Sequence, residues 1–351
     1  MQSRYTNALI KELQLYRPQN IKTDTIFIGG GTPSLLRQHL ITEILKAAEA
    51  AFSVSKDSEI TMEANPGTLT RDKLYTCRKA GINRLSIGAQ SMDDRLLKIM
   101  GRIHTAEDFK RTYQAARTAG FQNINVDLMF GIPGQTQDIW RKTLQEVLEM
   151  EPEHISFYSL QLEEGTDFFR RYKNDQMDLP PEQEEREMYH EGIRLLKEAG
   201  YVHYEISNCA RPGFQCRHNL KYWNFDEYAA AGLGAHSFSY EKGRQCNTSS
   251  LDTYIRRLEA GELPTDRQAY EQETLQDYMG EYAFTALRKR EGLDTEDFYR
   301  TFGADFYRVY ADRLRDLQAY EQKGLLILKK DRLFLTEKGI DCSNEIMAEF
   351  V

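Results

Sequence analysis

The sequence lacks the features that place a protein in a membrane, on nucleic acid or in an oxidising compartment. Among its 351 residues no apolar run approaches the roughly 18 residues that span a bilayer. Basic residues are not in excess, since 46 Lys and Arg stand against 54 Asp and Glu, a net charge of −8. The five cysteines are too scattered for a disulfide framework. We therefore expect a cytoplasmic protein with no membrane span and no nucleic-acid partner.

A signal sequence is also missing from the first residues. Instead, apolar side chains recur at helical spacing, at Tyr5, Leu9, Leu13 and Tyr16. This spacing predicts that the chain begins inside a core-facing helix, an element that a strand or capping segment normally precedes.

From residue 21 to about 160, short apolar runs alternate with longer helical patterns. Strands are predicted at 25–28, 59–62, 84–87, 123–129 and 154–160. Helices are predicted between them at 37–51, 70–80, 106–119 and 136–150. This alternation indicates an α/β fold with a parallel sheet and right-handed crossovers.

The rest of the chain changes character. A helix at 182–199 and a strand at 201–206 are followed, beyond residue 265, by helical patterns at 275–290 and 305–323 and a hairpin at 325–335. Helices followed by a hairpin resemble a winged-helix-like module. Because the chain is acidic, we expect this module to pack or act as a lid and not to bind DNA.

Polar groups follow several of the predicted strands. The Gly29–Pro33 stretch, GGGTP, can bring its backbone close to a small polar ligand, although a tight turn explains it equally well. Glu63 can accept two hydrogen bonds, as from ribose hydroxyls, but taken alone it is better explained by a capping or surface role.

The next strands add three further polar side chains. Gln90 offers an amide, Arg102 a planar fork suited to carboxylates, and Asp127 a carboxylate within an apolar strand, where burial is costly unless the group is paired or used. Because parallel strands end at one rim, these groups and the glycine loop predict a ligand site there.

The order and spacing of five motifs resemble a known family. GGGTP, EANPGT, GINRLSIGAQS, MGRIHT and NVDLMFGIPGQT are similar to motifs of the radical S-adenosylmethionine proteins related to oxygen-independent coproporphyrinogen III oxidase. Within that family HNLKYW, at 218–223, resembles the HNxxYW signature of the heme chaperone branch. The resemblance covers essentially the whole chain. It implies a partial (β/α) barrel followed by a C-terminal helical and β-hairpin module.

The resemblance also implies roles for particular residues. Contacts with S-adenosylmethionine are implied for Gly30, Gly31, Thr32, Glu63, Gln90, Arg102 and Asp127. Heme binding is implied for His218 as an axial iron ligand, with Cys216 as a second candidate. Tyr222 and Trp223 could stack on a porphyrin, or be ordinary core aromatics. Read without the family, Cys209, Cys216 and His218 have no recognised zinc spacing and are compatible with inert core residues.

One defining element of the family is missing. A Cys-x3-Cys-x2-Cys loop after the first strand holds its [4Fe-4S] cluster, and none of the cysteines at 77, 209, 216, 246 and 342 has that spacing. We therefore expect an N-terminally shortened chain that does not assemble the cluster and whose barrel has an exposed edge.

Three functions remain open at this stage. The resemblance favours a heme chaperone that binds heme and S-adenosylmethionine and delivers heme to an acceptor protein. The alternatives are an oxygen-independent coproporphyrinogen III oxidase and an inactive truncated barrel. The expected parts are a partial barrel at 1–165, an extension with HNLKYW at 166–264 and the winged-helix-like module at 265–351.

Overall fold

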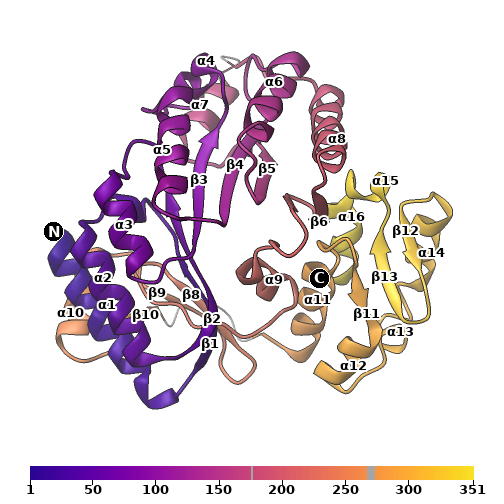
Figure 1. Cartoon of the computed structure of the whole chain (residues 1–351). Helices are drawn as coiled ribbons and strands as arrows, with labels where there is room; N and C mark the ends of the chain where they lie inside the picture. The colour runs from indigo at the N-terminus through magenta and orange to yellow at the C-terminus, as the bar shows by residue number, and fades with distance from the viewer. Residues whose placement is uncertain (175–176, 267–272) are drawn as a thin grey trace.

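A curved seven-stranded sheet organises the protein. The computed structural model describes residues 1–174, 177–266 and 273–351. Five parallel strands, in chain order, make most of the sheet: β1 Lys22–Ile28, β2 Ser53–Ala64, β3 Arg84–Gln90, β4 Ile124–Phe130 and β5 His154–Ser159. The antiparallel pair β6 Val202–Glu205 and β7 Asn208–Ala210 extends it beyond β5 (Figure 1). The predicted α/β fold with a partial barrel is confirmed.

Helices cover one face of this sheet. They are α1 Gln2–Tyr16, α2 Gln38–Ala51, α3 Arg71–Lys79, α4 Asp94–Ile99, α5 Ala106–Thr118, α6 Gln137–Leu148, α7 Asp167–Lys173 and α8 Glu182–Glu198, with short 3₁₀ turns at Arg17–Gln19 and Pro33–Leu35. Several begin at Thr or Asp caps; Thr105, for example, forms a reciprocal capping box with Asp108. No helix among the described residues is long and apolar enough to cross a bilayer.

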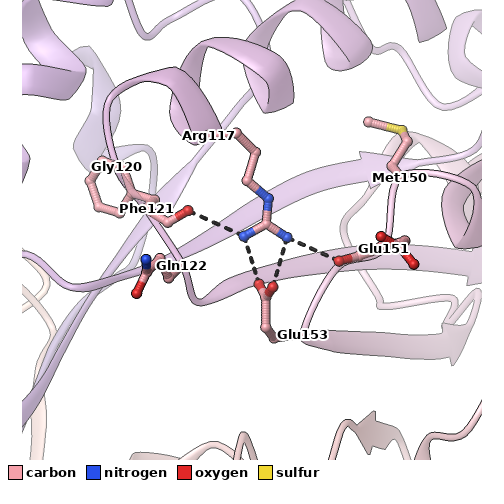
Figure 2. Close-up of a pocket in the computed structure, with 7 residues that line it drawn as sticks. All are labelled: Arg117, Gly120, Phe121, Gln122, Met150, Glu151 and Glu153. Atoms are coloured by element: carbon pink, nitrogen blue, oxygen red, sulfur yellow. Dashed lines mark hydrogen bonds and ion pairs between the residues drawn. The ribbon is translucent and has the colours of Figure 1, made fainter.

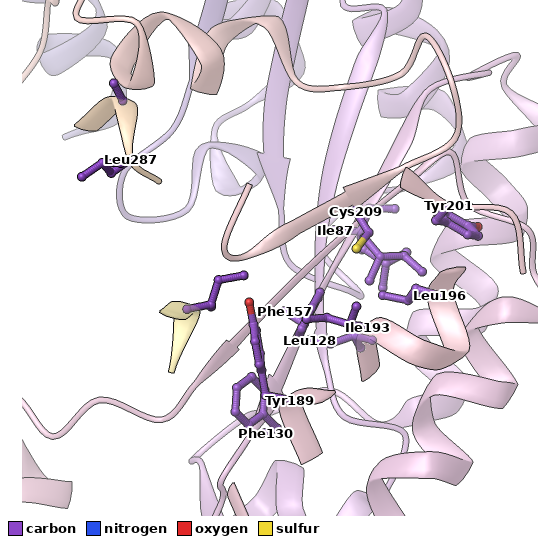
Figure 3. Packing of buried hydrophobic residues seen from close by; sticks show 14 of the residues in the cluster. Ile87, Leu128, Phe130, Phe157, Tyr189, Ile193, Leu196, Tyr201, Cys209 and Leu287 are labelled. Carbon is purple, nitrogen blue, oxygen red and sulfur yellow. The ribbon is translucent and has the colours of Figure 1, made fainter. Parts of the chain in front are cut away.

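The strands alternate between two kinds of side chain. Outward-facing residues such as Ile87, Leu128 and Phe157 are buried, and they pack with Tyr189 and Ile193 of α8 (Figure 3). The alternate positions, which face the inside of the curve, are largely polar. Parallel strands covered on both faces usually read as continuous apolar runs, so this polar inner face is set apart from an ordinary core.

Beyond β7 the chain builds two smaller sheets. The first contains β8 His236–Ser239, β9 Gly243–Asn247 and β10 Thr265–Asp266, preceded by helix α9 Arg217–Trp223 and accompanied by α10 Leu251–Glu259. The second contains β11 Leu293–Asp294, β13 Arg332–Leu335 and β12 Leu326–Leu328. Around it lie α11 Leu275–Ala286, α12 Thr295–Phe302, α13 Phe306–Val309, α14 Leu314–Gln322, α15 Glu337–Ile340, α16 Ser343–Met347 and the 3₁₀ turn Ala348–Phe350.

Two C-terminal helices differ from the prediction. The single helix expected at 305–323 is two, because Tyr310 leaves the helical conformation (φ −103°, ψ 30°) while its ring packs against Phe306 and Phe350. The helix expected at 275–290 ends at Ala286, since the following backbone bonds to the large sheet: Ile206 N–H donates to Arg288 O and Arg290 N–H to Tyr204 O. The apolar periodicity continues through both breaks and so concealed them.

The first helix packs on the predicted face. Leu13 of the expected apolar stripe is buried, Tyr5 and Leu9 are half-buried against the core, and Thr6, Ala8 and Glu12 complete the buried side. The Glu12 carboxylate accepts from Gly232 N–H (2.8 Å), Asn247 Nδ2 (2.6 Å) and Tyr254 OH (2.5 Å). A buried carboxylate is tolerated here because its oxygens are hydrogen-bonded.

Candidate functional site

The glycine loop and Glu63 meet at the carboxyl ends of β1 and β2. Gly30 N–H donates to Glu63 Oε2 (3.1 Å), and burial raises the pKa of this carboxyl. Gly30 and Gly31 have φ of 78° and 60°, values that favour glycine, and open space lies where their side chains would be. Thr32 Oγ1 accepts from Asn65 Nδ2 (3.3 Å). The loop thus presents bare backbone beside a carboxylate.

Gln90 occupies the last position of β3 in an unusual conformation. Its φ is 65°, which costs energy for a residue with a side chain. Gly88 leaves room for its amide, since a Cβ there would lie 2.8 Å from Gln90 Nε2. Tyr158 OH donates to Gln90 Oε1 (3.2 Å), and burial, with the nearby Asp127 charge, raises the pKa of Tyr158 to about 12. Sequence reasoning missed Tyr158.

Asp127 lies deeper, in the middle of β4. Its carboxylate accepts from Asn125 Nδ2 (2.7 Å) and Ser86 Oγ (3.1 Å), and burial raises the pKa of the carboxyl. These bonds explain how the carboxylate is tolerated without a ligand. Arg102 follows α4 and is half-buried; no hydrogen bond or ion pair joins its side chain to another described residue.

These groups fit one family cofactor and not the other. Bare glycine backbone, the Glu63 carboxylate and the Gln90 amide along one rim suit a small ligand with hydroxyl, amino and adenine groups, as S-adenosylmethionine has. A [4Fe-4S] cluster needs clustered thiolates. Within the described ranges no three His, Cys, Asp or Glu side chains converge as metal ligands, and Cys77, Cys209 and Cys216 are buried apart.

HNLKYW forms helix α9, which lies against β1 on the inner side of the sheet. Glu59 of β2 holds its first turn by accepting from Arg217 N–H and His218 N–H (3.1 Å each). Asp24 pairs with Arg217 (3.3 Å) and Lys221 (2.9 Å). The sequence reasoning gave this segment no secondary structure, and no cap residue precedes it; tertiary partners 158–197 residues away fix the helix.

His218 is neutral and both its ring nitrogens are occupied. Nδ1 is hydrogen-bonded to Thr25 Oγ1 (2.9 Å) and Nε2 to Tyr222 OH (3.0 Å), while the ring stacks on Phe27 at 5.1 Å. Burial lowers the pKa of His218 to about 4. A ligand could reach Nε2 once the Tyr222 hydroxyl turns away.

The other candidates around α9 are engaged. Cys216 is fully buried, its Sγ–H donates to Glu59 Oε1 (3.6 Å) and burial raises the pKa of the thiol to about 11. Burial also raises the pKa of Cys209. The Tyr222 ring packs edge-on against Tyr228, and the Arg288 guanidinium lies 4.4 Å from the Trp223 ring centroid.

The inner face carries polar residues that sequence reasoning did not single out. Besides Glu63, Gln90 and Asp127, it includes Glu59, Thr61, Arg84, Ser86, Asn125, His154 and Ser156. His154 joins this network through Asn125 (2.6 Å) and Tyr204 (2.8 Å). Polar residues at every second position of EITME and RLS were the available signal.

A pocket on the helix side of the sheet has a different character. It lies at the amino ends of β4 and β5, and Arg117 fills it by bonding Glu153, Phe121 O and Glu151 O (Figure 2). Because these charged groups are paired with one another, we assign the residues of this pocket a stabilising role and not a ligand-binding one.

Comparisons with known proteins identify the family. The Radical SAM superfamily model matches residues 1–147, and the HemN C-terminal domain model matches residues 274–341. The heme chaperone HemW of Bacillus subtilis is 34% identical over 99% of this chain and 91% of its own length. HemW of Lactococcus lactis is 33% identical over 99% and 89%. HemW of Escherichia coli is 40% identical over 70% and 65%.

Among solved structures, coproporphyrinogen III oxidase (HemN) of Escherichia coli has the same fold. The TM-score is 0.84 over 99% of this chain and 83% of that one, at 23% identity. Nearly full-length similarity to HemW at more than 30% identity shows the family. The chain therefore belongs to the HemW family of the radical S-adenosylmethionine superfamily.

Proposed function

We propose that this protein binds heme at helix α9 and delivers it to an acceptor protein. The relatives named heme chaperone extend over 99% of the chain, and HNLKYW is intact. The observation that carries the proposal is the geometry of His218, whose Nδ1 is bonded to Thr25 and whose Nε2 is bonded to the Tyr222 hydroxyl of the same helix. Burial, which lowers the pKa of this imidazole to about 4, also favours the neutral form that binds iron.

The surroundings of His218 suit an axial ligand. Thr25 holds Nδ1, which fixes the ring orientation in the way that outer partners orient metal-bound imidazoles. Nε2 then points at Tyr222 OH, one helical turn along α9. Iron would replace this single hydrogen bond. Tyr222 would thus bond Nε2 of His218 whenever no heme is bound.

The test is heme titration monitored by absorption spectroscopy. His218→Ala should lose the Soret shift of the complex and weaken binding at least tenfold. Tyr222→Phe should keep the spectrum and bind heme as well as or better than the parent, because the competing hydroxyl is gone.

His190→Ala provides the matched control. His190 is half-exposed and bonds Asp341 far from α9, so its loss should change nothing. An unchanged spectrum and affinity in His218→Ala would refute the axial role. Absence of any saturable heme binding by the parent protein would refute the function and favour an inactive barrel.

We also propose that the rim binds S-adenosylmethionine through Gly30, Gly31, Thr32, Glu63, Gln90, Arg102 and Asp127. When bound, this cofactor supplies an adenosyl group and a reactive sulfonium. The glycine loop would leave room for it, Glu63 would accept from its hydroxyls, and Gln90 would offer an amide. Glu63→Gln should weaken binding in equilibrium dialysis, and an unchanged affinity would reduce Glu63 to a partner of the loop.

The division at residues 165 and 264 remains our proposal, with a packing role for the C-terminal module. Arg288 lies over Trp223, and Lys289 Nζ donates to Asn224 Oδ1 (2.6 Å). These contacts support a module that braces the end of α9. The alternative of oxidative decarboxylation rests on likeness of fold to HemN alone, and we do not propose it.

A further inference from the structure

Arg84 is a buried cation that makes no hydrogen bond or ion pair with the residues that the structure describes, although Asp127 lies near enough for the two charges to interact. Its residue surface is 2% exposed, and Nε is fully enclosed. Arginine stays charged in proteins, and burying a charge without a partner is strongly unfavourable. A bound anion would compensate this buried positive charge.

The protein's own acids near Arg84 are already engaged. Both oxygens of Glu59 accept from the first turn of α9, and Asp127 accepts from Ser86 and Asn125. His154, also on the inner face, is neutral because burial holds its pKa well below its usual value. None of them forms an ion pair with Arg84 in this structure.

A second unpaired group lies beside Arg84. Thr61 of β2 is directly in register with Arg84 of β3 and is fully buried, and its Oγ1 has no hydrogen-bond partner within the described ranges. Buried hydroxyls are nearly always bonded. A hydroxyl donor next to a guanidinium is the arrangement that binds a carboxylate, because both can donate to the same pair of oxygens.

The position of this pair relates it to His218. Phe27 is in register with Thr61, so Phe27, Thr61 and Arg84 form one row across three neighbouring strands on the inner face. The His218 ring stacks on Phe27 at one end of the row. Arg84 at the other end is two strand spacings away, about 10 Å.

We propose that Thr61 and Arg84 form a carboxylate site that takes one propionate of a porphyrin whose iron is bound by His218. The inference rests on the proposed heme function and deepens it. A porphyrin carries its carboxylates on the ring edge, away from the metal, which matches a cation set apart from the iron ligand.

The test compares heme with its dimethyl ester, in which both propionates are blocked. The parent protein should bind the diester at least tenfold more weakly than heme. Arg84→Met should bind heme and diester with equal affinity, close to that of the parent for the diester. Retained diester binding then proves that the variant is folded.

Thr61→Val gives a second variant with nearly unchanged shape. It should reduce the preference for heme over the diester about threefold, without affecting diester affinity. Arg95→Met, at an exposed surface position, controls for the lost positive charge and should keep the full preference.

The possible results distinguish failure of the propionate site from failure of heme binding itself. If the parent binds heme and diester equally while His218→Ala still loses the Soret shift, the propionate site is refuted and the axial role stands. If Arg84→Met retains the preference, the site is likewise refuted. If neither compound binds the parent, the heme function itself fails.

Discussion

Two arginines lie on opposite sides of the same sheet and are treated in opposite ways. On the helix side, Arg117 bonds the Glu153 carboxylate, the Tyr113 hydroxyl and two backbone carbonyls. On the inner side, Arg84 is more deeply buried and bonds nothing in the described chain. Buried charges in a folded protein are normally paired. The bonds of Arg117 therefore account for it as a structural residue, whereas the unpaired Arg84 supports our proposal of a ligand site.

The largest expected effect on stability comes from removing Arg117, whose hydrogen bonds lie on the helix side of the sheet. Arg117→Met should lower the free energy of unfolding by about 3 kcal/mol, because the half-buried Glu153 loses its cation and two carbonyls lose their donor. Urea denaturation would measure it. Heme affinity should not change; a loss of affinity at constant stability would contradict the separation of the two faces.

The next effect is a pH dependence carried by a buried histidine of β6. Burial lowers the pKa of His203 to about 4 from 6.5. Below pH 6.5 the unfolded chain takes up this proton while the folded protein does not, so stability falls as the pH drops toward 4. Between pH 6.5 and 5 this amounts to about 2 kcal/mol.

The variant His203→Gln should remove that part of the acid loss. Stability of parent and variant is compared by urea denaturation at pH 7, 6 and 5, and the difference between them should shrink or reverse toward low pH. Parallel curves would mean that His203 takes up its proton equally in the folded and unfolded chain, so that burial does not lower its pKa.

A gain of stability is expected when the unpaired Arg84 on the inner face of the sheet is replaced. Arg84→Met replaces an unpaired buried cation with an apolar side chain and should raise the free energy of unfolding by about 1 to 2 kcal/mol. Thermal and urea unfolding without ligand would show it. A large loss would mean that Arg84 pairs within the fold, which would remove the contrast with Arg117.

The smallest effect is expected at Thr61. Thr61→Val removes a buried hydroxyl that has no partner, so stability should rise by up to about 1 kcal/mol. Differential scanning calorimetry resolves a change of this size. A destabilised Thr61→Val protein would show that the hydroxyl is bonded within the apo fold.

The sequence predicted the parallel strands well, because apolar runs and glycine turns are local signals. It also placed Glu63 and Gln90 near strand ends, while their role in binding a cofactor stays a prediction. It missed helix α9, since residues distant in sequence, Glu59 and Asp24 among them, hold that segment in place. It also missed Arg84 and Thr61, which look like ordinary residues until register aligns them. The environments of the two candidate ligands also depend on packing and could not be predicted. Cys216 is buried against Glu59, whereas His218 is neutral and bonded to Thr25.

The bonds of Glu12 have a consequence for the order of events during synthesis. Its partners lie 220 to 242 residues further along the chain, in Gly232, Asn247 and Tyr254. Helix α1 therefore cannot bury its carboxylate until the chain has been synthesised through Tyr254. Contacts of such long range slow folding, because a long loop must close before they form. Helix α1 thus reaches its final position only after α9, which carries His218, has been synthesised.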